Sequence, residues 1–76
     1  MPHVIVKLQS RRSEQQKARI ADEVTKAVMA TANCAEDAVS VCMEDVAAND
    51  WTEKVYKRDI ISNSARLYRK AGYDPR

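Results

Sequence analysis

Phenylalanine is missing from this chain, glycine and histidine each occur once, and cysteine occurs twice. A single glycine excludes a glycine-rich loop of the kind that cradles phosphates. A single histidine, without other ligand-type residues at metal spacing, predicts that the protein binds no metal ion. Cys34 and Cys42 are too few for a disulfide scaffold. Free thiols in a reducing cytoplasm are therefore the default expectation.

Long apolar runs are also missing, and this absence predicts that no segment spans a membrane. Near the start of the chain, Arg11 and Arg12 are followed by polar and charged residues, so no export signal is evident. We therefore expect a cytoplasmic protein without a membrane partner.

The chain has little excess of either charge, because it contains 13 basic and 11 acidic residues. Basic side chains do gather in the last third of the chain, at Lys54, Lys57, Arg58, Arg66, Arg69 and Lys70. Such spacing is more typical of a solvated helix face than of a nucleic-acid site. Nucleic acid is therefore not an expected partner, although binding through this basic segment stays a distant alternative.

The length of 76 residues indicates one small domain that spans residues 1–76. With no phenylalanine, the large apolar side chains are mostly valine, isoleucine, leucine and methionine, which make a thin core. Small chains with limited cores are often stabilised by association. We therefore expect a homo-oligomer.

Two strands flanking a helix are predicted in the first half of the chain. Residues 3–8 and residues 39–44 alternate between apolar and polar side chains, a pattern typical of strands. Between them, Ser13 and Gln16 form a capping-box pattern that begins a helix. Helical spacing then continues to just before Asn33, a residue type that often ends helices.

A second helix is predicted in the last third of the chain. Asp50 and Glu53 form another helix-start signal. Helical spacing continues to Lys70, and Gly72 stands where that helix should end. The polar stretch at residues 61–64 is a possible break within it.

A strand, a helix and a second strand form a β-α-β unit, in which the strands should be parallel with a right-handed crossover. Two parallel strands do not make a stable sheet alone. We therefore predict an α/β (α+β) fold in which a homodimer joins two such units into one four-stranded sheet.

Pro2 stands at the start of the first predicted strand, where proline is tolerated for structural reasons alone. The chemical interpretation is more specific. If Met1 is removed, the ring nitrogen of Pro2 becomes a free secondary amine that can accept and donate a proton. A group that shuttles protons works best with a pKa near the working pH, and an α-amino group starts at about 7.7–8.0. Pro2 is thus a candidate general base.

The segments PHVIVKL, RSEQQK and VSVCMED, with Trp51 after them, resemble the 4-oxalocrotonate tautomerase family. The later segments WTEKVYKRDI, LYRK and AGY are similar to the dimeric phenylpyruvate-type branch of that family. This resemblance implies a β-α-β tautomerase fold with parallel strands and a C-terminal helix. It also implies a cofactor-independent isomerase that catalyses keto-enol proton transfer on a small acid, either a 2-hydroxy enoate or a phenylenolpyruvate-like acid.

The resemblance assigns roles to individual residues. Pro2 matches the general base, Arg12 the arginine that binds the substrate carboxylate, and Trp51 the aromatic wall of the pocket. Arg11 is an alternative for the carboxylate role, because the length of the turn varies in the family. Ser40 stands where hexameric members carry a second arginine. A single cation favours a monocarboxylate, such as a phenylenolpyruvate-like acid, over a dicarboxylate.

Other interpretations stay open at this point. A non-catalytic dimeric binding module on the same fold needs no free amine, and a retained Met1 would favour it. Trp51 fits a core or an interface as well as a pocket wall, and His3 is more typical of a structural histidine than of a proton partner. The sequence also leaves open the physiological substrate, the choice between dimer and hexamer, and side activities such as dehalogenation.

Overall fold

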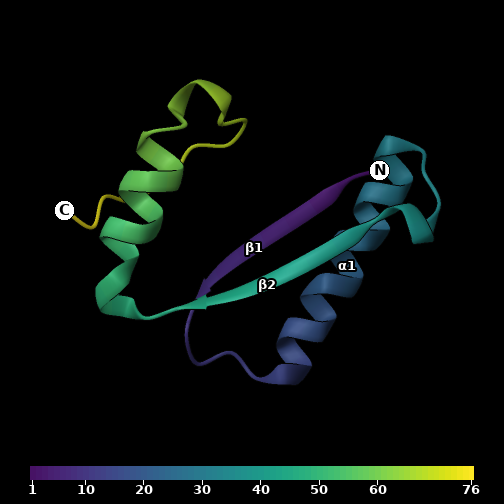
Figure 1. Ribbon diagram of the computed structural model, residues 1–76, viewed down its shortest axis with the longest axis horizontal. Helices are drawn as coiled ribbons and strands as arrows, with labels where there is room; N and C mark the ends of the chain where they lie inside the picture. The colour runs from purple at the N-terminus through teal and green to yellow at the C-terminus, as the bar shows by residue number, and fades with distance from the viewer. The chain divides into compact units, whose positions relative to one another are not determined.

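The computed structural model describes all residues from Met1 to Arg76, which fall into two compact units. The first, Met1–Asp45, is called the strand–helix unit, and the second, Val46–Arg76, the C-terminal unit. The strand–helix unit holds β1 (His3–Gln9), α1 (Glu14–Ala32) and the short helix η1 (Glu36–Ala38), and β2 (Ser40–Val46) leads out of it (Figure 1).

The two strands form the predicted parallel sheet, and their side chains pair in a constant register. The ring nitrogen Nδ1 of His3 lies 2.6 Å from Ser40 Oγ at one end. Farther along, Lys7 Nζ lies 3.9 Å from Glu44 Oε2. Both pairs are 37 residues apart in sequence, so one sheet face carries the side chains of His3, Lys7, Ser40 and Glu44, because strand side chains alternate between faces.

Helix α1 packs on the opposite face of this sheet. Lys17 Nζ contacts Asp45 Oδ2 at 2.8 Å, and Met43 lines a small cavity together with Ala18 and Ala21 of α1. Met43 and Asp45 alternate with Ser40 and Glu44 along β2, as the period of two requires. The crossover helix therefore covers the face that the His3–Ser40 pair does not occupy.

The predicted limits of α1 are confirmed. The Ser13 hydroxyl accepts a hydrogen bond from the Gln16 amide at 3.0 Å, and the Gln16 side chain accepts one from the Ser13 amide at 2.9 Å. This reciprocal pair satisfies amides that the first helical turn leaves without partners. At the other end, Asn33 adopts the left-handed conformation with φ 56°, which asparagine tolerates better than most residues.

The core is as thin as the composition suggests. Val55 and Tyr56 are the buried hydrophobic residues, 4% and 6% exposed, and both belong to the C-terminal unit. No residue of α1 is buried. None of the helices combines the length and the apolar character that a membrane crossing requires.

The C-terminal unit contains three short helical segments in place of one long helix. These are η2 (Ala48–Asp50), the π-helix η3 (Thr52–Ile61) and η4 (Ser64–Arg66). The prediction of a helix that continues to Lys70 and ends at Gly72 is therefore wrong. Asp50 also does not cap the main helix. The N-cap position of η3 is occupied by Trp51, whose side chain makes no capping hydrogen bond.

The polar stretch after Ile61 explains why η3 ends early. The Ser62 hydroxyl donates to the carbonyl of Lys57 at 2.9 Å. The Asn63 amide group donates to the carbonyl of Asp59 at 3.0 Å. Side chains that bind the last carbonyls of a helix compete with backbone amides that would extend it. The predicted break at residues 61–64 is thus the end of the helix.

Candidate active site

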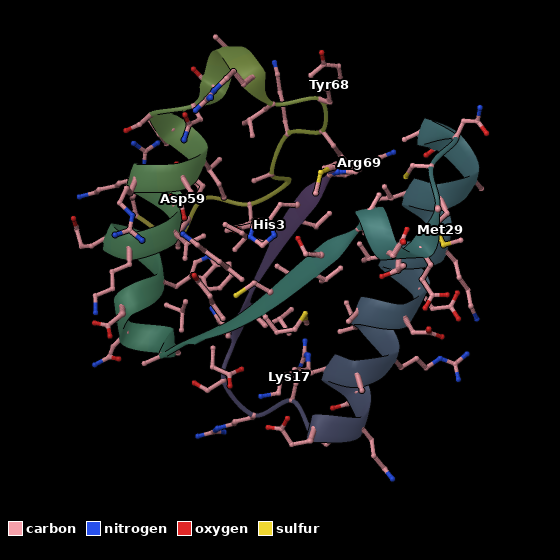
Figure 2. The ribbon with its side chains drawn as sticks, turned by 45° about the vertical axis from the view of Figure 1, so that its right-hand side comes forward. His3, Lys17, Met29, Asp59, Tyr68 and Arg69 are labelled. Atoms are coloured by element: carbon pink, nitrogen blue, oxygen red, sulfur yellow. The ribbon has the colours of Figure 1, made fainter.

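Pro2 lies directly before β1, at the end of the sheet where β2 also begins. The backbone amide of Ser40 donates to the carbonyl of Pro2 at 3.2 Å, and His3 Nδ1 is hydrogen-bonded to Ser40 Oγ at 2.6 Å. In Figure 2 the His3 side chain lies on the side of β1 away from α1. The structure thus brings together two predicted site residues, Pro2 and Ser40, and adds His3 to them.

Met1 is fully exposed, with a relative accessibility of 106%. While Met1 is attached, the nitrogen of Pro2 is an amide and cannot accept a proton. Removal of Met1 converts that nitrogen into a secondary amine at the end of β1. Removal of this exposed first residue therefore decides whether the nitrogen of Pro2 is an amide or an amine.

The two candidate arginines lie at the other end of β1. Arg11 and Arg12 follow the last residue of that strand, as the turn between β1 and α1 in Figure 1 shows. Seven strand residues at roughly 3.3 Å each separate Pro2 from this turn by about 23 Å. Within one chain, the predicted base and the predicted carboxylate-binding residue are therefore not brought together.

The arginine turn has an unusual backbone. Arg11 adopts φ 92°, a region that residues with a side chain rarely occupy. Such conformations cost of order 1–3 kcal/mol and are often found at functional sites. The backbone geometry therefore supports a functional role for the turn, without deciding between Arg11 and Arg12.

Arg12 borders a groove of about 410 Å³ along one side of α1. The groove also includes Ile20 and Val24 as apolar residues, with Arg19 and Glu23 at its charged margin. These positions recur at helical spacing on one side of α1. The Arg12 side chain is thus exposed beside an apolar surface.

Trp51 belongs to an aromatic cluster within the C-terminal unit. Its indole Nε1–H donates to the hydroxyl of Tyr73 at 3.0 Å. The Tyr73 ring lies 5.7 Å from the ring of buried Tyr56 at an interplanar angle of 47°, and the Arg76 guanidinium lies 5.2 Å from the Tyr56 ring centroid. The chain end therefore folds back on η3 and holds the indole of Trp51.

Sequence reasoning interpreted His3 as a structural histidine but missed its pairing with Ser40, and it missed the pairing of Tyr73 with Trp51. His3 and Ser40 are the first residues of two parallel strands, so their pairing could have been inferred from the register once the strand limits were known. The Trp51–Tyr73 contact has no comparable local signal, because it depends on how the last residues fold back.

The shifted pKa values belong to ion pairs away from Pro2. A hydrogen bond to Asp45, with a further contribution from Glu14, raises the pKa of the Lys17 ammonium. Hydrogen bonds from Arg76 lower the pKa of the Asp74 carboxyl. No three His, Cys, Asp or Glu side chains are grouped so that they could hold a metal ion.

Comparison with protein families gives one match that covers most of the chain. The family model described as "Tautomerase enzyme" matches residues 2–55. This span includes Pro2, both arginines of the turn, Ser40 and Trp51.

Two relatives match almost the whole chain. A protein of Xylella fastidiosa (strain 9a5c) named "Probable tautomerase" is 40% identical over 73 residues, covering 96% of this chain and 89% of the relative. Tautomerase PptA of Cronobacter sakazakii (strain ATCC BAA-894) is 33% identical over 75 residues, covering 97% of this chain and 99% of the relative. The likeness therefore extends into the C-terminal unit.

Solved structures align with part of the chain. A structure from a study of the 4-oxalocrotonate tautomerase isozymes of Methylibium petroleiphilum aligns with a TM-score of 0.64 at 30% identity, covering 66% of this chain and 81% of that chain. A similar match is found to TomN, a 4-oxalocrotonate tautomerase homologue of the tomaymycin biosynthetic pathway, with a TM-score of 0.65 at 30% identity, covering 66% of this chain and 77% of that chain. The predicted family and its fold are confirmed.

Proposed function

Because the chain belongs to the tautomerase family and is an isomerase of that class, we propose that it ketonises a phenylenolpyruvate-like acid with Pro2 as the general base. The observation that carries this proposal is the position of Pro2 at the start of β1, directly after Met1, which is fully exposed to solvent. Family membership favours this activity over a binding module without catalysis.

The proposed reaction moves one proton and needs no cofactor. The neutral prolyl amine accepts the proton of the enol hydroxyl, and the electron pair of that O–H bond forms the carbonyl. The carbon–carbon double bond then takes up a proton at the neighbouring carbon from the prolyl ammonium. The amine returns to its neutral state, so the same group serves as base and acid.

Arg12 is proposed to bind the substrate carboxylate through two parallel hydrogen bonds, with Arg11 as the alternative. The length of β1 separates Arg12 from Pro2 of the same chain, so the arginine must come from a second copy. A two-fold axis perpendicular to the sheet pairs two β1 strands antiparallel, which sets the start of one strand beside the end of the other. The expected homodimer with a four-stranded sheet thus completes the site.

The uncharged Ser40 and the aromatic Trp51 are proposed to select the substrate. Ser40 lies at the Pro2 end and adds no cation there, so a second carboxylate on the substrate gains no partner. The indole of Trp51 provides a flat apolar surface suited to an aromatic or conjugated acid. A monocarboxylate with an aromatic substituent fits both features.

The ketonisation rate of phenylenolpyruvate tests this proposal, measured for wild type and Pro2→Ala at several pH values. Intact mass first establishes that Met1 has been removed. We expect a wild-type rate well above the uncatalysed one and a loss of at least about 100-fold in the variant, typical of removing a general base. Equal rates in the two proteins would place the site elsewhere, and a wild type without activity would exclude the proposed substrate class.

A further inference from the structure

Ser40 is hydrogen-bonded to both Pro2 and His3. Its backbone amide donates to the carbonyl of Pro2 at 3.2 Å. Its hydroxyl is hydrogen-bonded to Nδ1 of His3 at 2.6 Å. One residue of β2 therefore restrains two consecutive residues at the start of β1.

Pro2 needs such restraint because it becomes the first residue once Met1 is removed. Chain ends are poorly ordered unless other groups hold them. The bond to the Pro2 carbonyl fixes one point but still permits rotation of the terminal ring. Once Met1 is removed, the amine is joined to the chain only through the peptide unit between Pro2 and His3, so a restraint on His3 limits how far the amine can move.

The His3–Ser40 pair is closer than the Lys7–Glu44 pair on the same face of the sheet. Lys7 and Glu44, farther along the same face, are 3.9 Å apart, beyond hydrogen-bonding range. The His3–Ser40 bond forms in either tautomer, because the serine hydroxyl can donate to a bare Nδ1 or accept from Nδ1–H. The bond therefore needs no charge on either partner.

We propose that His3 and Ser40 act together as positioning residues that orient the prolyl amine for proton transfer. This inference rests on the proposed function of Pro2 and adds a role for His3 and for the Ser40 hydroxyl. The pair acts on the proton-transfer step, because misorientation of a reacting group lowers the rate after the substrate has bound. Loss of the bond should therefore lower kcat and leave KM nearly unchanged.

Four variants and one control test the pair with phenylenolpyruvate as substrate. Ser40→Ala removes the hydroxyl and keeps the backbone bond to Pro2, and His3→Phe keeps a ring without its nitrogen atoms. We expect each to lower kcat by about tenfold, the size of one misplaced contact in a reacting arrangement, with KM within about twofold. The double variant should lose no more than either single variant, since both remove the same bond.

Rescue and a matched control separate positioning from general damage. Ser40→Thr retains the hydroxyl and should keep kcat close to that of wild type. Glu44→Gln changes a side chain on the same face of β2 and should leave kcat unchanged. Nitrogen-15 relaxation of the His3 amide should show larger fast motion in Ser40→Ala than in wild type or Glu44→Gln.

The possible results separate the role of the His3–Ser40 pair from the role of Pro2 as the general base. A higher KM in Ser40→Ala, with His3→Phe like wild type, would mean that Ser40 contacts the substrate directly and would overturn the pair. Wild-type kcat in both single variants, while Pro2→Ala is inactive, would overturn the inference and leave Pro2 as the base. A wild type without activity would overturn both.

Discussion

The strand–helix unit has six basic and seven acidic residues, whereas the C-terminal unit has seven basic and four acidic ones. In the first unit, the polar side chains pair across elements, as Lys17 and Asp45 do at 2.8 Å. In the second, aromatic rings are in contact around Tyr56, which is 6% exposed. The strand–helix unit thus has an ion pair that links two of its elements, whereas the C-terminal unit combines ion pairs between residues close in sequence with a small aromatic cluster.

This difference suggests a division of the proposed function. Pro2, Ser40 and both arginines of the turn belong to the strand–helix unit, so the residues proposed to react and to bind the carboxylate lie beside the two ends of β1. Trp51, the residue proposed to recognise the shape of the substrate, belongs to the C-terminal unit. Changes in the first unit should therefore affect catalysis as such, and changes in the second should affect the choice of substrate.

The largest expected effect comes from Arg12. Arg12→Ala should lower kcat/KM for phenylenolpyruvate by roughly 100-fold, because two charge-assisted hydrogen bonds to the carboxylate are lost. Arg19→Ala removes an arginine of α1 outside the proposed site and should stay near wild type. If Arg11→Ala shows the large loss and Arg12→Ala does not, the carboxylate role passes to Arg11.

Mixing two inactive variants tests whether the site is shared between copies. When Pro2→Ala and Arg12→Ala chains are refolded together, half of the dimers contain one of each. One of the two sites in such a dimer has both intact residues, so about a quarter of wild-type activity should return. Activity that stays at the level of the separate variants would show that Pro2 and Arg12 of one chain act together.

A smaller effect is expected from removing the Tyr73 hydroxyl, which accepts a hydrogen bond from the indole of Trp51. Tyr73→Phe removes the acceptor of the indole hydrogen bond and keeps the ring that contacts Tyr56. We expect kcat/KM for an aromatic enol acid to fall by about three- to tenfold, the worth of one hydrogen bond. A small aliphatic enol acid should be affected less. Equal losses for the two substrates would contradict a role in substrate choice.

The smallest effect on activity is expected from Ser13. Ser13→Ala removes half of the capping box and should destabilise the fold by about 1 kcal/mol. Thermal unfolding followed by circular dichroism should show the lower midpoint, and Ser13→Thr should restore it. Activity below the unfolding range should stay unchanged, because the cap lies outside the proposed site. A loss of activity without loss of stability would link the cap to the arginine turn.

The β-α-β part could be predicted from sequence because its signals are local. Alternation in residues 3–8, the Ser13–Gln16 pair and Asn33 each determine a feature within a few residues of themselves. The C-terminal helix could not be predicted to its end, since apolar spacing continues past Ile61. The side chains of Ser62 and Asn63 bind the last carbonyls there, and a polar pair of this kind can also lie on the outside of a continuous helix.

The candidate site was less predictable than the fold. Pro2 was identified by its chemistry, and Arg12 and Trp51 by the resemblance to the tautomerase family. Neither argument revealed that β1 holds Pro2 and Arg12 apart. The partnership of His3 with Ser40 depends on strand register, and that of Trp51 with Tyr73 on the path of the last residues. Neither can be read from the neighbours of the residues concerned.

The length of β1 also has a consequence for how activity varies with the amount of enzyme. If an active site needs residues from two chains, a newly made single chain is inactive. The reaction rate in very dilute solution then falls with the square of the chain concentration. Above the dissociation constant of the pair, the rate becomes proportional to the amount of protein. Because its seven residues hold Pro2 and Arg12 apart, β1 would then make the reaction rate depend on how often two chains meet.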